Sequence, residues 1–250
     1  MQQVREVRDT GDVPLHRHPE WVERFPWLVQ GTTGRSGTPE FDLGLFGSQP
    51  VGPVLARWRT LRETLGFRQA VHARQAHGAD LMTHEIVTPG LLVLERFDAH
   101  LTRTPDILLT ASVADCVPVF LVAPDARAVA VLHAGWRGAA GGMLEKGVRS
   151  LCDFTGSSAS DLHVHFGPAI CGRCYEVGPE VHEALGEPVP ATNTPIDLRR
   201  ILARRAAALG VSEVNNSISA YCTKCDNAEF FSHRAGDPGR QMGVIGIVGY

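Results

Sequence analysis

Two imidazoles and one thiol in this chain stand beside apolar runs or glycine, where they could bind a metal ion or carry out covalent chemistry. His133 ends the apolar run at 128–133, and Cys116 lies 17 residues earlier, directly before the run at 117–123. His77 precedes Cys116 by 39 residues, in the segment RQAHGAD. In open α/β sheets, groups at strand ends line the crevice where ligands bind. Two imidazoles and a thiolate leave a tetrahedral zinc ion one open position, whereas Cys116 and His133 alone could form a nucleophile–base pair.

Strands are predicted on both sides of these residues. Short apolar runs bounded by turn residues predict strands at 107–111, 117–123, 128–133, 162–166 and 244–248. Residues 27–46, with three glycines as punctuation, indicate a strand, a turn and a second strand.

Helices are predicted between some of these strands. Apolar residues at helical spacing predict three helices. The first follows Pro53 and contains Val54, Trp58, Leu61 and Leu65, and the second contains Leu144, Val148 and Leu151. The third contains Leu198, Ile201, Leu202 and Leu209, with Asp197 as its cap. Strands and helices are interspersed, so we predict a mixed α/β fold. Several strands follow one another without a helix, which argues against simple βαβ winding.

Composition limits the class of protein. The 250 residues are 44% hydrophobic and 20% charged, which is typical of a globular chain that can bury a core without disulfides. The net charge is −3 and no dense basic run is present, so we expect no nucleic-acid partner. The start, MQQVREVRDTGD, lacks an apolar signal core, and no apolar stretch approaches the roughly 18 residues of a membrane span. We therefore expect a cytoplasmic protein with no membrane partner and reduced or metal-bound cysteines.

Nine segments, spread over nearly the whole chain, carry a family resemblance. They are GTTGRSG (31–37), FDLGLF (41–46), RQAHGAD (74–80), FDAHLT (97–102), VADCVPVFLV (113–122), LHAGWRGAAGGML (132–144), GPAICGRCYEVGPEV (167–181), YCT (221–223) and FFSHRAGDPGRQMGVI (230–245). In these segments the chain resembles the laccase-domain, or polyphenol oxidase-like, family. That family is also described as purine nucleoside phosphorylases and adenosine deaminases, and it includes a bacterial peptidoglycan-editing factor.

The resemblance implies a single-domain, layered α/β/β/α fold over residues 1–250 and one zinc ion held by His77, Cys116 and His133. It also implies phosphorolysis of adenosine, inosine, guanosine and methylthioadenosine, and deamination of adenosine, with purine nucleosides and phosphate as partners. An older family assignment is copper-dependent polyphenol oxidation, so copper is a second candidate metal. A Cys116–His133 hydrolase, peptidoglycan-precursor editing and a non-enzymatic metal-binding module remain alternatives.

Either nucleoside reaction needs further groups near the metal. For deamination, water activated by zinc would attack C6 of adenine, and a carboxylate would move protons. Asp115 and Asp98 are the candidates, although Asp115 could instead orient a ligand. For phosphorolysis, phosphate attacks the ribose C1′ and needs cationic or backbone donors. Arg137, before a glycine-rich helix start, offers a fork-shaped donor.

Four other residues are expected to bind substrate. They are Arg35, Asp42, Tyr175 and Arg240. The two arginines are weaker candidates for phosphate, and Tyr175 could stack on a base. Asp42 stands where the family commonly has the Asn of NLG, which could change ribose or base recognition. Residues 231–235, FSHRA, lack the second Arg of the family's FSYRR-like segment, which would alter an anion contact made there.

Two Cys-x₂-Cys pairs have the spacing of metal ligands. They are Cys171 with Cys174 and Cys222 with Cys225, separated by 47 residues. That separation exceeds the usual zinc-ribbon spacing, so a local structural role is favoured over a second zinc. His163 and His165 share the face of one predicted strand, and we expect that face to be hydrated or bonded within the core.

Overall fold

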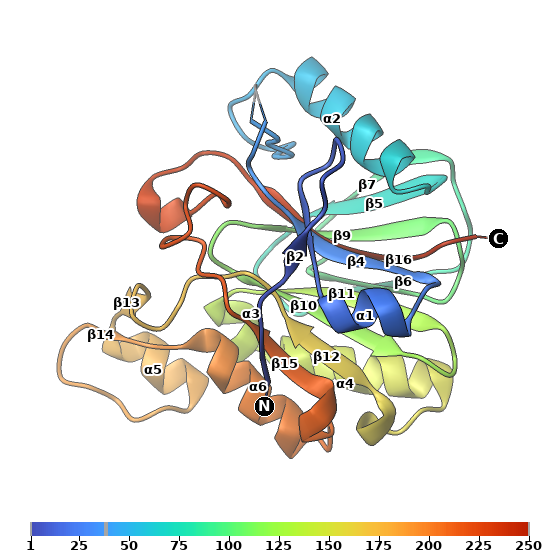
Figure 1. Cartoon of the computed structure of the whole chain (residues 1–250). Helices are drawn as coiled ribbons and strands as arrows, with labels where there is room; N and C mark the ends of the chain where they lie inside the picture. The colour runs from blue at the N-terminus through green and yellow to red at the C-terminus, as the bar shows by residue number, and fades with distance from the viewer. Residues whose placement is uncertain (1, 38–39, 250) are drawn as a thin grey trace.

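The structure, a computed structural model, describes residues 2–37 and 40–249 and is built around two stacked seven-stranded sheets (Figure 1). The first sheet has the order β1 (Gln2–Val4), β15 (Asn216–Ser219), β12 (His163–Phe166), β10 (Val117–Ala123), β11 (Ala128–Ala134), β8 (Ala99–Thr102) and β6 (Leu81–His84). The second has the order β2 (Val7–Arg8), β3 (Leu15–Arg17), β4 (Leu28–Thr33), β16 (Gln241–Ile247), β9 (Ile107–Val113), β5 (Gln69–Arg74) and β7 (Gly90–Glu95). Strands β13 (Glu176–Val177) and β14 (Thr194–Pro195) form a separate small hairpin.

Strand β10 shows why the two sheets stack. Every residue from Val117 to Ala123 is buried. Val119 and Leu121 belong to a core shared with helices, whereas Phe120 belongs to a core between the sheets. Successive side chains of a strand point to opposite faces, so an entirely apolar strand must be covered on both sides.

Helices cover the two outer faces. The helices are α1 (Pro19–Arg24), α2 (Val51–Thr64), α3 (Trp136–Ala140), α4 (Met143–Thr155), α5 (Pro179–Leu185) and α6 (Leu198–Ala208). Helices α4 and α6 pack on the first sheet and α2 on the second (Figure 1). Both sheets contain parallel and antiparallel pairs. The mixed α/β fold with α/β/β/α layers is therefore confirmed.

Most predicted elements are present. The apolar stripe Val54, Trp58 and Leu61 is buried on α2, which begins at Val51 with Pro53 in its first turn. The Asp197 carboxylate caps α6 by accepting a hydrogen bond from the backbone N–H of Arg200 at 3.2 Å.

The prediction of a second strand within residues 27–46 is wrong. Strand β4 ends at Thr33, and residues 40–46 form a loop, while residues 38 and 39 lie outside the described part of the chain. Phe41 and Leu43 are buried in the core formed by α2. Trp58 Nε1 donates a hydrogen bond to the Leu43 carbonyl at 2.9 Å. The apolar spacing of this loop therefore reflects packing against a helix and not pairing in a sheet.

The histidine face of β12 is bonded within the core, as expected. His163 and His165 are buried, and His165 contacts the Glu6 carboxylate and the Ser217 hydroxyl at 2.9 Å each. Burial lowers the pKa of His163 to about 4.

None of the described helices is long and apolar enough to cross a bilayer.

Candidate metal centre

The sheet topology brings His77, Cys116 and His133 together. Strands β5 and β9 are parallel, so His77 after β5 and Cys116 after β9 lie at the same end of the second sheet. Strand β10 starts directly after Cys116 and pairs antiparallel with β11, which places His133 opposite Pro118. One ligand atom from each of the three lies within 4.8 Å of the others. This closeness allows the three atoms to contact one metal ion.

A buried carboxylate, Asp98, contacts the imidazole of His133 and the backbone that carries His77. Its Oδ1 lies 2.9 Å from His133 Nδ1 and accepts a hydrogen bond from the His77 backbone N–H at 2.9 Å. Its Oδ2 accepts from the N–H groups of Ala76 at 3.1 Å and Gly78 at 2.9 Å. A proton on Nδ1 of His133 leaves Nε2 with its lone pair for a metal. The same bonds hold His77 in a left-handed conformation, φ 57°, that is costly for a residue with a side chain.

The electrostatics favour a thiolate at Cys116. Burial opposes ionisation, but the neighbouring His133 and His77 lower the pKa of the Cys116 thiol to about 6. Burial likewise opposes a charged His133, yet Cys116 and Asp98 raise its pKa to about 9. The thiolate is the form that binds metals and attacks electrophiles. A nucleophile–base pair would use only His133, whereas in a metal site His77 would supply the third ligand.

Gly135 lets the backbone close against the three ligands. A Cβ atom there would lie 3.1 Å from Cys116 Sγ and 3.2 Å from His77 Cδ2. Any side chain would therefore push against the ligand set.

Two cavities meet at these ligands. The larger, of about 460 Å³, is lined by loop 44–47, the end of β5 and Arg240. The smaller, of about 320 Å³, is lined by Trp136, Arg137, Tyr175 and Arg234 among others. His77, Cys116 and His233 line both. Both volumes are in the range of small-molecule sites, roughly 300–1,000 Å³.

Four of the six expected substrate or catalytic residues lie on these walls. Asp115, Arg137 and Tyr175 line the smaller cavity and Arg240 the larger. The guanidinium of Arg137 lies 4.3 Å from the centre of the Trp136 ring, and that of Arg234 lies 5.1 Å from the Tyr175 ring. Burial, helped by the charge of Cys116, raises the pKa of Tyr175 to about 12, so its hydroxyl remains a hydrogen-bond donor near neutral pH.

Asp115 lines the smaller cavity, but its carboxylate is already bonded. Oδ1 accepts from the Thr223 hydroxyl at 2.6 Å, and Oδ2 accepts from the backbone N–H of Arg234 at 2.7 Å. The residue is buried and has a left-handed backbone, φ 86°. This arrangement ties the connection that carries Cys116 to two distant segments.

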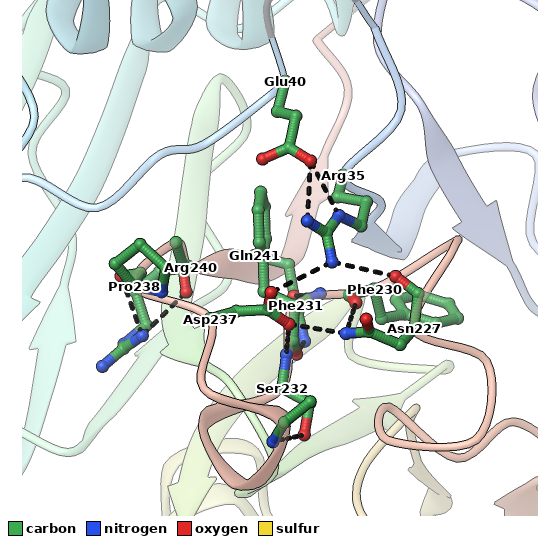
Figure 2. A network of polar contacts seen from close by, with 12 residues as sticks. Arg35, Glu40, Asn227, Phe230, Phe231, Ser232, Asp237, Pro238, Arg240 and Gln241 are labelled. Atoms are coloured by element: carbon green, nitrogen blue, oxygen red, sulfur yellow. Dashed lines mark hydrogen bonds and ion pairs between the residues drawn. The ribbon is translucent and has the colours of Figure 1, made fainter.

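Arg35 and Asp42 are not among the residues that line the two cavities. The guanidinium of Arg35 bonds Glu40 Oε1 at 2.6 Å and Asp237 Oδ1 at 3.2 Å (Figure 2). Asp42 Oδ1 accepts from the N–H groups of Gly44 at 2.8 Å and Arg240 at 2.9 Å. Both side chains thus join loops that build or support the wall of the larger cavity.

His233 is a site residue that the sequence interpretation overlooked. It is exposed and lines both cavities beside Cys116. The sequence interpretation of residues 231–235 concerns only the arginine that this segment lacks. The usable signal was the imidazole itself, which stands where the family's FSYRR-like segment has tyrosine.

Comparisons with known proteins show the family to which the chain belongs. The family described as multi-copper polyphenol oxidoreductase laccase matches residues 31–248, and the chain belongs to that family. A protein of Geobacillus stearothermophilus named purine nucleoside phosphorylase YlmD is 33% identical over 249 residues, covering 89% of this chain and 91% of the relative. A protein named adenosine deaminase RL5, from an unknown prokaryotic organism, is 36% identical over 184 residues, covering 69% and 68%. The crystal structure of YlmD from Geobacillus stearothermophilus superposes with a TM-score of 0.89 at 28% identity, covering 98% of this chain and 100% of that one. The predicted family resemblance is confirmed.

Proposed function

We propose that this protein is a zinc-dependent enzyme that cleaves purine nucleosides with phosphate and deaminates adenosine. The convergence of His77, Cys116 and His133 where two cavities meet carries the proposal. The names of the two relatives, a purine nucleoside phosphorylase and an adenosine deaminase, support the substrate class. Phosphate and a purine nucleoside are the partners that follow.

The ligand set suits zinc. Two nitrogens and one sulfur would fill three of the four positions that zinc prefers and would leave one for water or substrate. Bound zinc would supply a Lewis acid that polarises water or a substrate oxygen. Multicopper oxidation needs several copper centres, each with its own ligands. Among the described residues, the one other cluster of three or more such ligands consists entirely of cysteines, so we favour zinc over copper oxidase chemistry.

The chain's own residues divide the reactants between the cavities. The larger cavity, with Arg240 and loop 44–47, would take the nucleoside, and Arg137 in the smaller cavity would bind phosphate through a charge-assisted fork. The ribose C1′ would then lie between them. A phosphate oxygen forms the new bond to C1′ while the bond to the purine breaks, and the purine leaves with the bonding electrons and takes up a proton.

We assign proton transfer and the positioning of site residues to different side chains. Both oxygens of Asp115 are bonded, so we assign it to positioning Thr223 and Arg234. Asp98 likewise positions the imidazole of His133 and the backbone of His77. His233 lines both cavities, and an imidazole can both donate and accept a proton, so it is our candidate for proton transfer.

A second candidate function rests on the contacts of His133 with Asp98 on one side and with Cys116 on the other. A carboxylate that orients an imidazole beside a thiolate is also the arrangement of a cysteine hydrolase. A metal-free chain that iodoacetamide inactivates by alkylating Cys116 would support this function. Activity that is lost on chelation and restored by zinc supports the nucleoside enzyme.

Product identification by mass spectrometry tests the proposed function. The zinc-loaded protein is incubated with adenosine, with and without phosphate, beside a Cys116→Ala variant as the control. We expect adenine and ribose 1-phosphate only when phosphate is present, and inosine in both cases. Unchanged adenosine under both conditions would contradict the proposal.

A further inference from the structure

Four cysteines outside the metal centre come together on two neighbouring connections. Cys171 and Cys174 lie on the segment after β12, and Cys222 and Cys225 lie on the segment after β15. Because β12 and β15 are parallel neighbours, the segments that leave them run side by side. An isolated β-bridge between Ala169 and Cys222 continues this pairing beyond the strands. The fold therefore removes the long separation in sequence between the two pairs.

The positions of the sulfur atoms fit a single ion. All four Sγ atoms lie within 4.8 Å of one another, and those of Cys174 and Cys225 are 3.4 Å apart. Four thiolates at about 2.3 Å from a tetrahedral zinc ion lie about 3.8 Å from each other. All six cysteines of the chain are free thiols in the structure. Only small side-chain movements are needed for the four sulfurs to surround an ion.

Backbone N–H groups orient this cluster. The N–H groups of Cys171 and Cys225 both donate to Cys222 Sγ, at 3.2 Å and 3.4 Å. Each pair also forms a tight turn, because Cys174 N–H donates to the Cys171 carbonyl at 2.9 Å and Asp226 N–H to the Cys222 carbonyl at 2.8 Å. Donors that hold a ligand sulfur in place are typical of metal–thiolate sites.

The charge around the cluster also suits a metal. Four thiolates around Zn²⁺ carry a net charge of −2, and each Cys-x₂-Cys turn contains one cation, Arg173 in the first and Lys224 in the second. An all-sulfur tetrahedral set selects a soft or borderline ion such as zinc and leaves no position for substrate.

The cluster is connected to the smaller cavity. Tyr175, which follows Cys174, lines that cavity. Thr223, between Cys222 and Cys225, donates its hydroxyl hydrogen bond to Asp115 at 2.6 Å. The two turns therefore support one wall of the cavity and the connection that carries Cys116.

We propose that Cys171, Cys174, Cys222 and Cys225 bind a second zinc ion in a closed tetrahedral site that fastens this wall. The site is independent of the nucleoside chemistry proposed above. Its effect would be structural, because all four ligand positions are filled by the chain.

Metal content measured by mass spectrometry tests this second site. Protein purified under reducing conditions from zinc-supplemented cells should hold two zinc ions per chain. The Cys174→Ser/Cys225→Ser variant and the Cys116→Ala variant should each hold one. Cys152→Ser is the matched control, since Cys152 lies on α4 outside both clusters, and it should keep two. One zinc in the intact chain that Cys116→Ala removes entirely, or iron in place of zinc, would overturn the proposal.

Two further measurements test the four-cysteine site without altering any of its cysteines. In cobalt-loaded protein, thiolate-to-metal absorption should correspond to five sulfur ligands, and Cys116→Ala should remove about one-fifth of it, because Cys116 gives one of those sulfurs. Titration of thiols in chelated, unfolded protein should find six. Two disulfides in protein kept under reducing conditions, or absorption that Cys116→Ala abolishes, would contradict a four-cysteine site.

Discussion

The two clusters of metal-competent side chains differ in what surrounds them. His77, Cys116 and His133 combine two nitrogens with one sulfur and line the larger cavity, and the first two also line the smaller one. The four-cysteine cluster offers only sulfur and lies between two turns held by their own backbone. Catalytic zinc sites keep an open position and structural zinc sites do not. The first cluster is therefore suited to chemistry and the second to holding chain segments together.

The groups that hydrogen-bond to the candidate ligands also differ between the two clusters. A buried carboxylate, Asp98, contacts the imidazole of His133, which makes that ligand more basic. Backbone N–H groups contact the sulfur of Cys222 instead. A side chain can tune the reactivity of a ligand, whereas a backbone turn chiefly fixes its place. The arrangement of the first cluster thus suits the tuning of a ligand, and that of the second suits the fixing of chain segments.

The largest expected effect is a loss of nucleoside turnover that variants of the first cluster show and variants of the four-cysteine cluster do not. Cys116→Ala should reduce nucleoside turnover to the uncatalysed background, because one of three ligands is lost, while the circular dichroism spectrum stays unchanged. His77→Ala should behave alike, since the large core does not depend on this site. Cys174→Ser/Cys225→Ser should lower the melting temperature and retain measurable turnover. Equal losses of turnover in all three folded variants would show that the two clusters do not differ in role.

The next effect concerns the carboxylate behind the imidazoles. Asp98→Asn should weaken zinc binding and turnover by about 10- to 100-fold, as for other carboxylates behind metal-bound histidines. Competition with a chromogenic chelator measures the affinity. Asp80→Asn is the matched control, since Asp80 is exposed and contacts Lys146 at the surface. Zinc affinity that does not change in Asp98→Asn would remove Asp98 from the support of this centre.

A smaller effect is expected on the KM for phosphate when the proposed phosphate-binding residue Arg137 is replaced. Arg137→Ala should raise the KM for phosphate about tenfold or more, because a charge-assisted hydrogen bond contributes about 1.5–3 kcal/mol. Initial rates at varied phosphate concentration measure this effect. Arg204→Ala, an exposed arginine that pairs with Glu187 on the helical side, should leave the KM unchanged. An unchanged KM in Arg137→Ala would place the phosphate elsewhere.

The smallest effect belongs to buried histidines outside both clusters. Burial and neighbouring His84 lower the pKa of His100 to about 3, below its usual 6.5. Below about pH 6.5 the unfolded chain binds a proton that the folded chain excludes, so this contribution to stability is present above that pH and lost as the pH falls. His100→Gln should reduce the drop in unfolding free energy between pH 7.5 and 5.5 by about 1 kcal/mol. Urea unfolding at both pH values tests this, and an identical drop in both proteins would refute it.

Much of the fold was predictable because its signals are local. The stripe of Val54, Trp58 and Leu61 and the cap at Asp197 depend on spacing along the chain. The loop at 40–46 could not be told from a strand, because its apolar residues pack against a helix that follows later in the sequence. Local patterns do not show which partner buries a side chain.

The sites show a similar limit. The motifs around His77, Cys116 and His133 indicated a shared metal through family resemblance, and the structure shows the three ligand atoms close together. The 47 residues between Cys174 and Cys222 argued against a second site, because the parallel pairing of β12 with β15 is not visible in ligand spacing. Arg35 and Asp42 belong to well-matched motifs, yet their side chains bond to neighbouring loops. A motif identifies a place in the fold more reliably than the role of each of its residues.

Zinc X-ray absorption of the Cys174→Ser/Cys225→Ser variant tests the site of His77, Cys116 and His133 most directly. In this variant only these three residues of the chain would surround the metal. We predict two nitrogen neighbours at about 2.0 Å, one sulfur at about 2.3 Å and one further light atom. A spectrum without sulfur, or folded protein that binds no zinc, would contradict the assignment of His77, Cys116 and His133 as a catalytic metal site.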